Sequence, residues 1–536
     1  MRRIPVLAAL VLTLGMAAPA VAAPRAPMVL PGDAAAASVR ADADTWLIGA
    51  KPGRAALAIA RRHGARRTGS AATGAHVVAK NRARALAAAL DAAGLLVYAE
   101  PNRLAERRQA VGADPLSPFA RWRDVVANPG IAPPPVTPAS PILALIDTQA
   151  DLAHPEFAGS GTVSLHPTGP YDAHGTATAA VAGAPVNGVG IVGIWPGMRT
   201  VNVGFPAGDI TCDDSAQGIA EAIEVNAAVI NMSYGSADVC YTEYVQIQYA
   251  IGKDIIPVAS AGNEFAQGNP LDFPASLPHV VTVAAVNPDD SPTYFSNANA
   301  AMDLAAPGAG IVTAVPAAFD GDGTPDGYTS LDGTSFSAPM VAAAATWVKA
   351  ARPTLSGGQV ADALRDSATD PGEPGYDAST GYGLVSLANA LTVEARPNDP
   401  LEPNDDIDWV NGRLFNDPDR AVFNGSRRRP VGFDAALDIA EDPDDVYRVV
   451  LPGGARARAT LQVDYGAADL LVFGARARRV DSARYRVARS RRSGRRTERL
   501  TLRNSAARKR TYYVAARSDP RARRLDAGYT LSLRRL

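Results

Sequence analysis

Three side chains that lie far apart in the sequence have the types that acyl-transfer chemistry needs. Ser335 lies in the stretch Asp-Gly-Thr-Ser-Phe-Ser-Ala-Pro-Met at 332–340, and an alanine-rich run follows it. Good helix formers with no charge before Lys349 predict a buried helix, with Pro339 in its first turn. Backbone N–H groups near a helix start are unpaired and favour negative charge. Ser335 is therefore either a nucleophile whose attack creates an oxyanion or a simple helix cap.

A base and a carboxylate are available to this serine. Among the six histidines, His174 opens a predicted helix beside a glycine, and an imidazole with a pKa near 6.5 can take a hydroxyl proton. Asp147 directly follows the apolar run 142–146, and a carboxylate at that end of a strand can fix the tautomer of an imidazole. Taken singly, His174 could be an ordinary helix-start residue and Asp147 a turn residue.

The elements that must position these residues alternate between apolar strands and helices. Such alternation over about 250 residues predicts an α/β fold with a doubly wound parallel sheet, whose strands are covered on both faces. Active sites of such sheets lie beyond the carboxyl ends of the strands. The expected strands are 142–146, 200–203, 229–232, 255–259 and 280–285, and the expected helices are 174–184, 215–225, 243–253 and 339–351.

Residues 141 to about 394 resemble a subtilisin-like serine peptidase domain. The matching motifs are Ile-Asp-Thr at 146–148, His-Gly-Thr at 174–176, Val-Ala-Ser-Ala-Gly-Asn at 258–263 and Gly-Thr-Ser-Phe-Ser-Ala-Pro at 333–339. Their order along the chain is Asp, His, Ser, as in subtilisin. The resemblance implies these roles: nucleophile, Ser335; general base and then acid, His174; orienting carboxylate, Asp147; and side-chain donor of the oxyanion hole, Asn263.

Two positions depart from the family pattern. Gln149 follows Thr148 where a glycine is usual, and Ala177 stands where the histidine motif usually has a second histidine. Neither change removes a catalytic atom. We therefore expect both changes to affect the reaction rate and the shape of the pocket, and not the type of reaction.

The resemblance also implies how protein or peptide substrates bind. Two segments resemble the strands that pair with an extended peptide through main-chain bonds, with side-chain pockets alternating along it. They are Ser233, Tyr234 and Gly235 on one side and Ser260, Ala261 and Gly262 on the other. Asp272, in Asp-Phe-Pro, resembles the base of the primary specificity pocket, where it would favour Lys or Arg before the scissile bond. The alternative for Asp272 is a solvated loop residue.

No cofactor is required for this chemistry, but the loop 185–191 resembles a structural calcium loop of the family. Backbone and side-chain oxygen atoms suit a hard cation such as calcium. A plain turn is the alternative. The implied ligands are the carbonyls of Pro185, Val189 and Ile191 and the side chains of Asn187 and Glu156.

The N-terminus has the pattern of a secretory signal. Two arginines precede an apolar run at 4–18 and the small residues Ala-Val-Ala at 20–22. That run is too short for a transmembrane helix, and no later stretch reaches about 20 apolar residues. We expect a secreted, periplasmic or extracellular monomer with no membrane span, in which Cys212 and Cys240 pair. A net charge of −1 argues against a nucleic-acid partner for the whole protein.

The expected domains are a signal peptide at 1–22, a propeptide at 23–112, a peptidase domain at 113–395, a linker at 396–408 and a β-sandwich at 409–536. Strand-helix alternation marks a small α+β module at about 44–104, which resembles the inhibitory propeptides of subtilisin-like peptidases. The protein's own propeptide would then be an intramolecular inhibitor of a zymogen. Short strand-like runs separated by turns predict the sandwich, which resembles bacterial pre-peptidase C-terminal domains.

The predicted function is that of a secreted serine endopeptidase working through an acyl-enzyme. One alternative is an inactive relative that only binds extended peptides. Another is a surface-binding or adhesion protein that uses the arginine-rich C-terminal domain. The run 489–496 in that domain could bind polyanions, but its composition favours a solvated loop. Zinc and dinucleotide chemistry have no support, because the sequence lacks His-Glu-x-x-His and a Gly-x-Gly-x-x-Gly in βα context.

Overall fold

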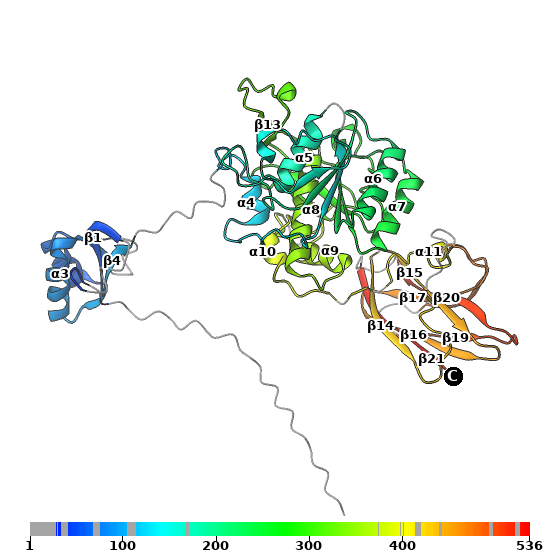
Figure 1. Cartoon of the computed structure of the whole chain (residues 1–536). Coiled ribbons are helices and arrows are strands. Elements are labelled where there is room, and N and C mark those ends of the chain that lie inside the picture. Colours follow the sequence, from blue (N-terminus) through cyan, green and yellow to red (C-terminus); the bar gives the residue numbers. More distant parts are fainter. Residues whose placement is uncertain are drawn as a thin grey trace, which may run out of the picture. The chain divides into compact units, whose positions relative to one another are not determined.

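The computed structural model divides the chain into two units, Met1–Arg108 and Gln109–Leu536 (Figure 1). The structure describes residues 28, 30–33, 41–67, 75–103, 114–167, 171–372, 375–396, 398–399, 401–412, 420–438, 442–491, 497–519 and 526–536. The expected signal peptide lies outside the described residues. No helix in these ranges is long and apolar enough to cross a membrane.

The N-terminal unit is a small α+β module. Its antiparallel sheet has the order β2-β3-β1-β4, with β1 at Ala41–Ala50, β2 at Arg66–Arg67, β3 at Ala75–Ala79 and β4 at Leu96–Arg103. Helices α2 (Arg54–Arg62) and α3 (Lys80–Ala92) turn their apolar sides onto this sheet and bury Ala60, Leu86 and Leu90. The sequence predicted three strands and two helices in this module, and all five are present. The two-residue strand β2 was not expected.

The region 113–395 is built on a seven-stranded parallel sheet with the order β11-β10-β9-β8-β5-β7-β6. The predicted α/β fold with a doubly wound sheet is confirmed. The strands are β5 (Leu143–Thr148), β6 (Thr162–Ser164), β7 (Thr200–Phe205), β8 (Val229–Met232), β9 (Ile256–Ser260), β10 (Val281–Val286) and β11 (Leu304–Pro307).

Helices cover both faces of this sheet. On β5, Leu143 and Leu145 join the core that contains α5 (Ala173–Gly183) and α8 (Thr334–Ala351), while Ala144 and Ile146 join the core on the opposite face. That second core contains residues of α6 (Cys212–Glu224) and α7 (Tyr241–Ile251). Successive side chains of a strand point to opposite faces, so burial on both faces requires the continuous apolar runs seen in the sequence.

Helix α8 begins at Thr334, so the expectation that Pro339 lies in its first turn is wrong. A proline inside a helix lacks the N–H that would reach the carbonyl four residues earlier, here that of Ser335. The Ser335 carbonyl instead accepts a hydrogen bond from the Ser233 hydroxyl at 2.8 Å. That bond satisfies the carbonyl, so the helix runs through the proline.

Several peptidase elements were not expected. Helix α4 (Trp122–Ala127) lies in the stretch 103–140 that the sequence suggested was a connector, and it buries Trp122 and Val126 in the core. The short strands β6 and β11 were missed too, because three or four residues show no periodicity. The remaining elements are α9 (Gly357–Asp366), α10 (Leu387–Ala390) and the hairpin of β12 (Ile311–Ala314) with β13 (Tyr328–Leu331).

The C-terminal part consists of two four-stranded antiparallel sheets, β14-β21-β16-β19 and β15-β20-β17-β18, which share one apolar core. The β14, β16 and β18 strands were not expected. β16 begins with Arg-Ala-Arg-Ala, β18 has valine as its one large apolar residue, and β14 has a glycine, two alanines and two aspartates among its eight residues. Their bounds are β14 Val431–Asp438, β15 Asp444–Leu451, β16 Arg456–Tyr465, β17 Ala468–Gly474, β18 Arg486–Ser490, β19 Glu498–Arg503, β20 Arg510–Ser518 and β21 Asp526–Arg535.

The expected linker 396–408 is packed rather than extended in its described part. Asn404 is fully buried and its side-chain oxygen accepts from the Val446 N–H, while Asp405 contacts the ring of His279 at 3.0 Å. Helix α11 (Ile407–Val410) follows at once. Here Asp399, Glu402, Asp442 and Asp445 bring carboxylate oxygens within 4.8 Å of one another.

Candidate active site

Asp147 and His174 meet at the carboxyl end of β5. The Nδ1 atom of His174 lies 2.7 Å from Oδ1 of Asp147, and the second carboxylate oxygen accepts from the Thr178 hydroxyl at 2.9 Å. The carboxylate also accepts the Thr148 N–H at 2.7 Å. Only 2% of the Asp147 side chain is accessible, against 34% for His174. The pair thus has a buried, hydrogen-bonded carboxylate and an imidazole whose other side faces solvent.

The backbone around His174 holds its ring in place. Asp172 caps α5 by accepting the His174 N–H at 3.0 Å. Gly175 packs directly on the Thr148 carbonyl, where any Cβ would collide, and it donates its N–H to the Thr148 hydroxyl at 2.9 Å. Burial opposes the charged imidazolium, but the nearby Asp147 outweighs it and raises the pKa of His174 above its usual 6.5.

Ser335 lies in the first turn of α8, and this turn is close to His174. Gly333, with φ of +152°, makes the tight approach into the helix. The ring of Phe336 lies 6.0 Å from the ring of His174, centroid to centroid. The Ser335 hydroxyl donates to the Ser233 carbonyl at 3.2 Å and shares no hydrogen bond with His174 in this structure. Such contacts often form only when substrate is bound, so the geometry remains compatible with a nucleophile.

Asn263 lies opposite the start of α8. Hydrogen bonds to its side-chain oxygen fix the orientation of its amide group. Its Oδ1 atom accepts both the N–H and the hydroxyl of Thr334 at 3.0 Å. The amide NH₂ group therefore points away from Thr334, and it has no acceptor among the residues that the structure describes. The Ser335 N–H likewise has no backbone acceptor in the described part of the chain. Two donors are thus available where a negative oxygen could bind.

The two predicted substrate segments follow neighbouring strands of the sheet. One (Ser233, Tyr234 and Gly235) comes directly after β8, and the other begins at Ser260, the last residue of β9, and continues through Ala261 and Gly262. The parallel pairing of β8 with β9 places both at the same sheet edge. Gly235 is exposed, which leaves its backbone accessible to a peptide.

Asp272 is placed between these two segments. Its carboxylate lies so close to Gly235 that any Cβ there would collide with it, and a Cβ on Gly262 would be 2.9 Å from its Oδ2 and 2.8 Å from Oε2 of Glu264. Burial, followed by the neighbouring Glu264, raises the pKa of Asp272 to about 7. Asp272 is 8% exposed, so it is not a solvated loop residue.

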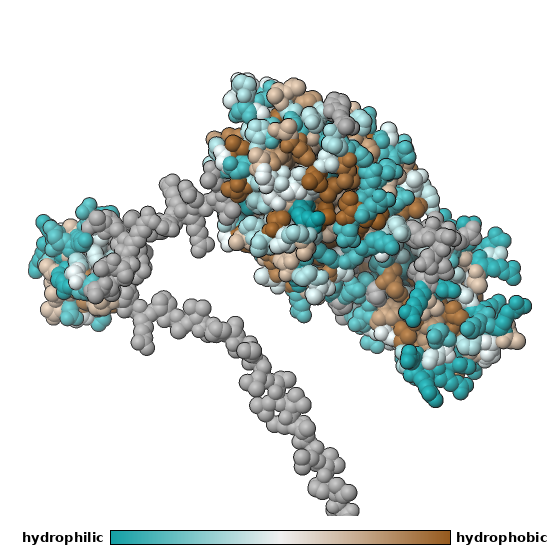
Figure 2. Space-filling model, viewed as in Figure 1, coloured by the Kyte–Doolittle hydropathy of each residue, from teal (hydrophilic) through white to brown (hydrophobic). Residues whose placement is uncertain are grey.

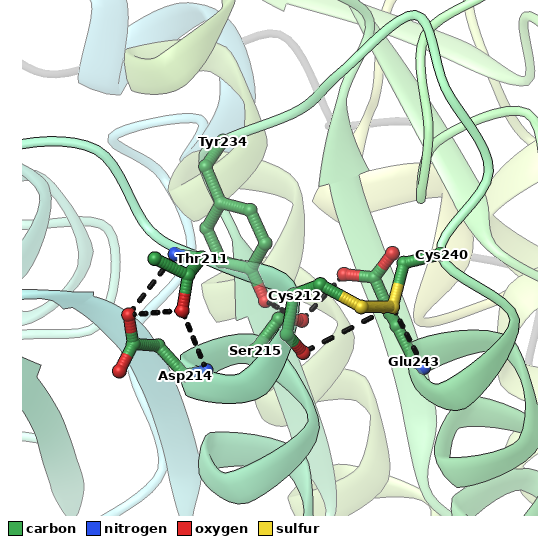
Figure 3. Close-up of a disulfide and its surroundings, with 7 residues drawn as sticks. All are labelled: Thr211, Cys212, Asp214, Ser215, Tyr234, Cys240 and Glu243. Atoms are coloured by element: carbon green, nitrogen blue, oxygen red, sulfur yellow. Dashed lines mark hydrogen bonds between the residues drawn. A yellow bond between two sulfur atoms is a disulfide. The ribbon is translucent and has the colours of Figure 1, made fainter.

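A disulfide joins Cys212 and Cys240 beside the first substrate segment (Figure 3). It links the N-terminal ends of α6 and α7. Beneath it, the Tyr234 hydroxyl lies 2.7 Å from the Ser215 hydroxyl, which also contacts the Glu243 carboxylate. This network anchors the Tyr234 side chain on Ser215 of α6.

The predicted calcium loop has oxygen atoms that lack protein donors. Glu156 is fully buried; one carboxylate oxygen accepts the Ile191 N–H at 3.0 Å and the other has no partner. The Asn187 amide nitrogen donates to the Glu156 carbonyl at 2.8 Å. Within the described ranges, no N–H donates to the carbonyls of Pro185, Val189 and Ile191.

Sequence reasoning missed Asp114, whose carboxylate accepts the Gly188 N–H at 2.7 Å. No motif signals it, because it lies far from the loop in sequence. Burial raises the pKa of Glu156 to about 7, and Asp114 adds to the rise. A buried, incompletely paired carboxylate among backbone carbonyls fits a hard cation.

The two departures from the family pattern fit into the core. The Gln149 side chain is buried and donates to the Ser164 hydroxyl at 3.0 Å, bridging β5 to β6. Ala177 is completely buried inside α5, and its carbonyl accepts from the Thr313 hydroxyl at 3.0 Å. Among the described residues neither side chain hydrogen-bonds to His174, and the pair with Asp147 is intact.

Comparison with known proteins decides the family. The model of the subtilase family of peptidases (Peptidase S8) matches residues 139–383, which include all four predicted catalytic residues. Subtilisin from Bacillus pumilus is 33% identical over 257 residues, covering 46% of this chain and 90% of that protein. The chain belongs to the subtilase family. Subtilisin E from Bacillus subtilis is also 33% identical, and this subtilase covers 65% of its length.

Solved structures similar to this subtilase include a psychrophilic subtilisin-like protease from Pseudoalteromonas sp. AS-11. It is 17% identical, with a TM-score of 0.41, over 51% of this chain and 96% of that one. The self-cleaved protease domain of PatA is 28% identical, with a TM-score of 0.41, over 47% and 95% of the two chains.

Proposed function

We propose that this subtilase is a serine endopeptidase that hydrolyses protein through an acyl-enzyme on Ser335. The observation that carries the proposal is the hydrogen bond of 2.7 Å between His174 Nδ1 and Asp147, next to the Ser335 turn. An imidazole held by Nδ1 presents Nε2 as the proton acceptor. The raised pKa of His174 suits a group that must take a proton and then return it.

The reaction follows from these positions. Ser335 Oγ attacks the scissile carbonyl carbon while its proton passes to His174 Nε2, and Asp147 stabilises the imidazolium. The carbonyl oxygen becomes an oxyanion, which accepts hydrogen bonds from the Asn263 amide and the Ser335 N–H. Collapse expels the amine, which takes the proton from His174. Water then attacks the acyl-enzyme with His174 again as base, and releases Ser335.

We propose that substrate binds as an extended strand between the segments 233–235 and 260–262. The exposed backbone at Gly235 and the shared sheet edge support this mode of pairing. We further propose that Asp272 gives the enzyme a preference for Lys or Arg before the scissile bond. A buried carboxylate wedged between both segments, with Glu264 nearby and no cation paired to it among the described residues, supports an acidic pocket.

We propose that the protein is exported and made as a zymogen, with the N-terminal unit as the inhibitory propeptide. The signal-like N-terminus and the disulfide between Cys212 and Cys240 support export. The independent fold of residues 41–103 supports a propeptide that can act as a separate inhibitor once it is cut from the peptidase domain.

Structural calcium is proposed at the loop 185–191. Glu156, Asn187, Asp114 and the loop carbonyls would hold the ion, which would neutralise buried carboxylates and stabilise the loop without taking part in the reaction. The unpartnered oxygen of Glu156 supports this donor set.

The proposed activity is tested by incubating the secreted protein with casein and a fluorogenic peptide. We expect cleavage of both, and a Ser335→Ala variant of equal melting temperature should reduce the rate by at least about 1,000-fold. A folded, processed wild type that binds these peptides without cleaving them would instead support the peptide-binding alternative.

A further inference from the structure

The outward face of the sheet β14-β21-β16-β19 carries a cluster of arginines at one end. In the strand register, Arg456 of β16 lies opposite Arg503 of β19, and Arg458 lies between Thr501 and Arg534 of β21. Arg499 follows two positions further along β19. These five arginines, here called the arginine face, are Arg456, Arg458, Arg499, Arg503 and Arg534, and all but the half-buried Arg458 are exposed.

The arginine face has no acidic partners. None of its five guanidinium groups forms an ion pair with any residue that the structure describes, and β16 through Gln462 contains no acid. Asp434 and Asp464 lie at the other end of the sheet, where both accept from the Thr530 hydroxyl. Like charges opposite one another on a sheet destabilise it, so the cluster is unfavourable for folding alone.

Neighbouring loops extend the positive charge. Arg427, Arg428 and Arg429 directly precede β14, whose first residue pairs with Leu533 next to Arg534. The turn that carries Arg508, Lys509 and Arg510 contacts the start of β16 through the Gly454 N–H and the Ala506 carbonyl. These six side chains are also exposed. Hydrophilic residues gather over this part of the molecule in Figure 2. The whole chain has a net charge of −1, so these basic side chains are concentrated at one end of the sheet and do not reflect a generally basic protein.

We propose that the arginine face binds a linear acidic polysaccharide. Guanidinium groups pair bidentately with carboxylate and sulfate groups. The positions between the arginines are Thr460, Thr501, Ser532 and Gln462, whose hydroxyl and amide groups can bond sugar hydroxyls. Among the described residues, the basic end of the face presents no aromatic ring for stacking nucleic-acid bases. Its exposed large apolar side chain, Leu536, is 42% exposed and lies among arginines, so it does not form the broad apolar face that membrane insertion needs.

The test uses the full chain with Ser335→Ala, so that binding is measured independently of proteolysis. The probe is a size-fractionated heparin oligosaccharide, which carries both sulfate and carboxylate, and affinity is measured over a range of salt concentrations. The test variant replaces Arg456, Arg458 and Arg503 by Gln. A matched control with the same change in charge replaces three exposed arginines near the other sheet: Arg476, Arg484 and Arg486.

We expect the test variant to bind heparin about tenfold or more weakly, with a salt slope lower by about 2 to 3, as expected for lost ionic contacts. The control should bind within about twofold of the parent. The test variant should melt at the same temperature or higher, because it loses a like-charge pair. Equal losses in the test and control variants would reduce the effect to net charge and overturn the proposal. Tighter binding of a short DNA duplex or of phosphatidylglycerol vesicles to the same arginines would also overturn it.

Discussion

An Asp272→Asn substitution should remove a preference for arginine before the scissile bond. The Asp272 carboxylate lies against Gly235 and Gly262, the glycines of both substrate segments, with Glu264 beside it. A hydrogen bond to a charged partner contributes about 1.5–3 kcal/mol. Because 1.4 kcal/mol corresponds to a factor of ten, the variant should lose about 10- to 100-fold in kcat/KM for an Arg substrate. Hydrolysis of a Leu substrate should change by less than about threefold.

The assay compares two fluorogenic peptides that differ only in Arg or Leu before the scissile bond. In the wild type, the Arg-to-Leu ratio of kcat/KM should rise as the pH increases through about 7, since the pKa of Asp272 is raised to that value and only the ionised carboxylate binds the cation. The ratio should be independent of pH in Asp272→Asn. An Asp238→Asn control removes an exposed acid from the same region and should leave the ratio unchanged.

Stability gives a second readout for Asp272. Its folded pKa is raised above the unfolded value, so its contribution to stability is present at low pH and is lost as the pH rises through about 7. At pH 8 the Asp272→Asn variant should therefore melt at a higher temperature than the wild type. This difference should shrink as the pH falls below 7 and vanish only below about pH 4, the ordinary pKa of an aspartate. An unchanged Arg-to-Leu ratio in a folded variant would refute the acidic pocket.

Three further perturbations test other parts of the site. Asn263→Ala should lower kcat by about 100- to 1,000-fold with little change in KM, the loss known for the corresponding donor of subtilisin, a relative of this protein. The kcat/KM of the wild type should fall as the pH drops through the raised pKa of His174, above 6.5, because the base must be neutral. Calcium should raise the melting temperature and a chelator should lower it, and Glu156→Gln should weaken this response if the loop holds the ion.

A specific outcome would contradict each of these three predictions. An Asn263→Ala enzyme that raises KM but keeps kcat would place this amide in substrate binding rather than at the oxyanion. A kcat/KM that is flat between pH 5 and 8 would exclude His174 as the base. A melting temperature that is indifferent to calcium and chelator in the wild type would refute the loop site.

The sheet could be predicted from the sequence because its strands are buried on both faces. The run 142–146, for example, has no polar residue, and Asp147 follows it directly. The sequence therefore shows both the strand and the candidate site residue at its end. Elements with weaker signals were missed. Helix α4 is only six residues long. β16 begins with Arg-Ala-Arg-Ala, so the first part of its inward face carries alanines in place of the large apolar residues that mark a strand.

Contacts between distant segments could not be predicted from local patterns. The start of α8 depends on the hydroxyl of Ser233, about a hundred residues earlier. This hydroxyl donates a hydrogen bond to the Ser335 carbonyl, which Pro339 cannot do because it has no N–H. Asp114 likewise joins the calcium loop only through the fold. The motifs located Asp147, His174 and Asn263, but the orientations of Asp147 and His174 depend on Thr178 and Asp172, which lie outside the motifs. Asn263 is oriented by Thr334, a motif residue to which no role had been assigned.

The central claim is that His174 and Asp147 activate Ser335, and covalent labelling by a fluorophosphonate measures this most directly. Mass spectrometry of the labelled, secreted protein should locate one adduct on Ser335. A folded His174→Ala variant should label at least about 1,000-fold more slowly. A folded, processed wild type that stays unlabelled, or that labels equally fast without His174, would contradict the account.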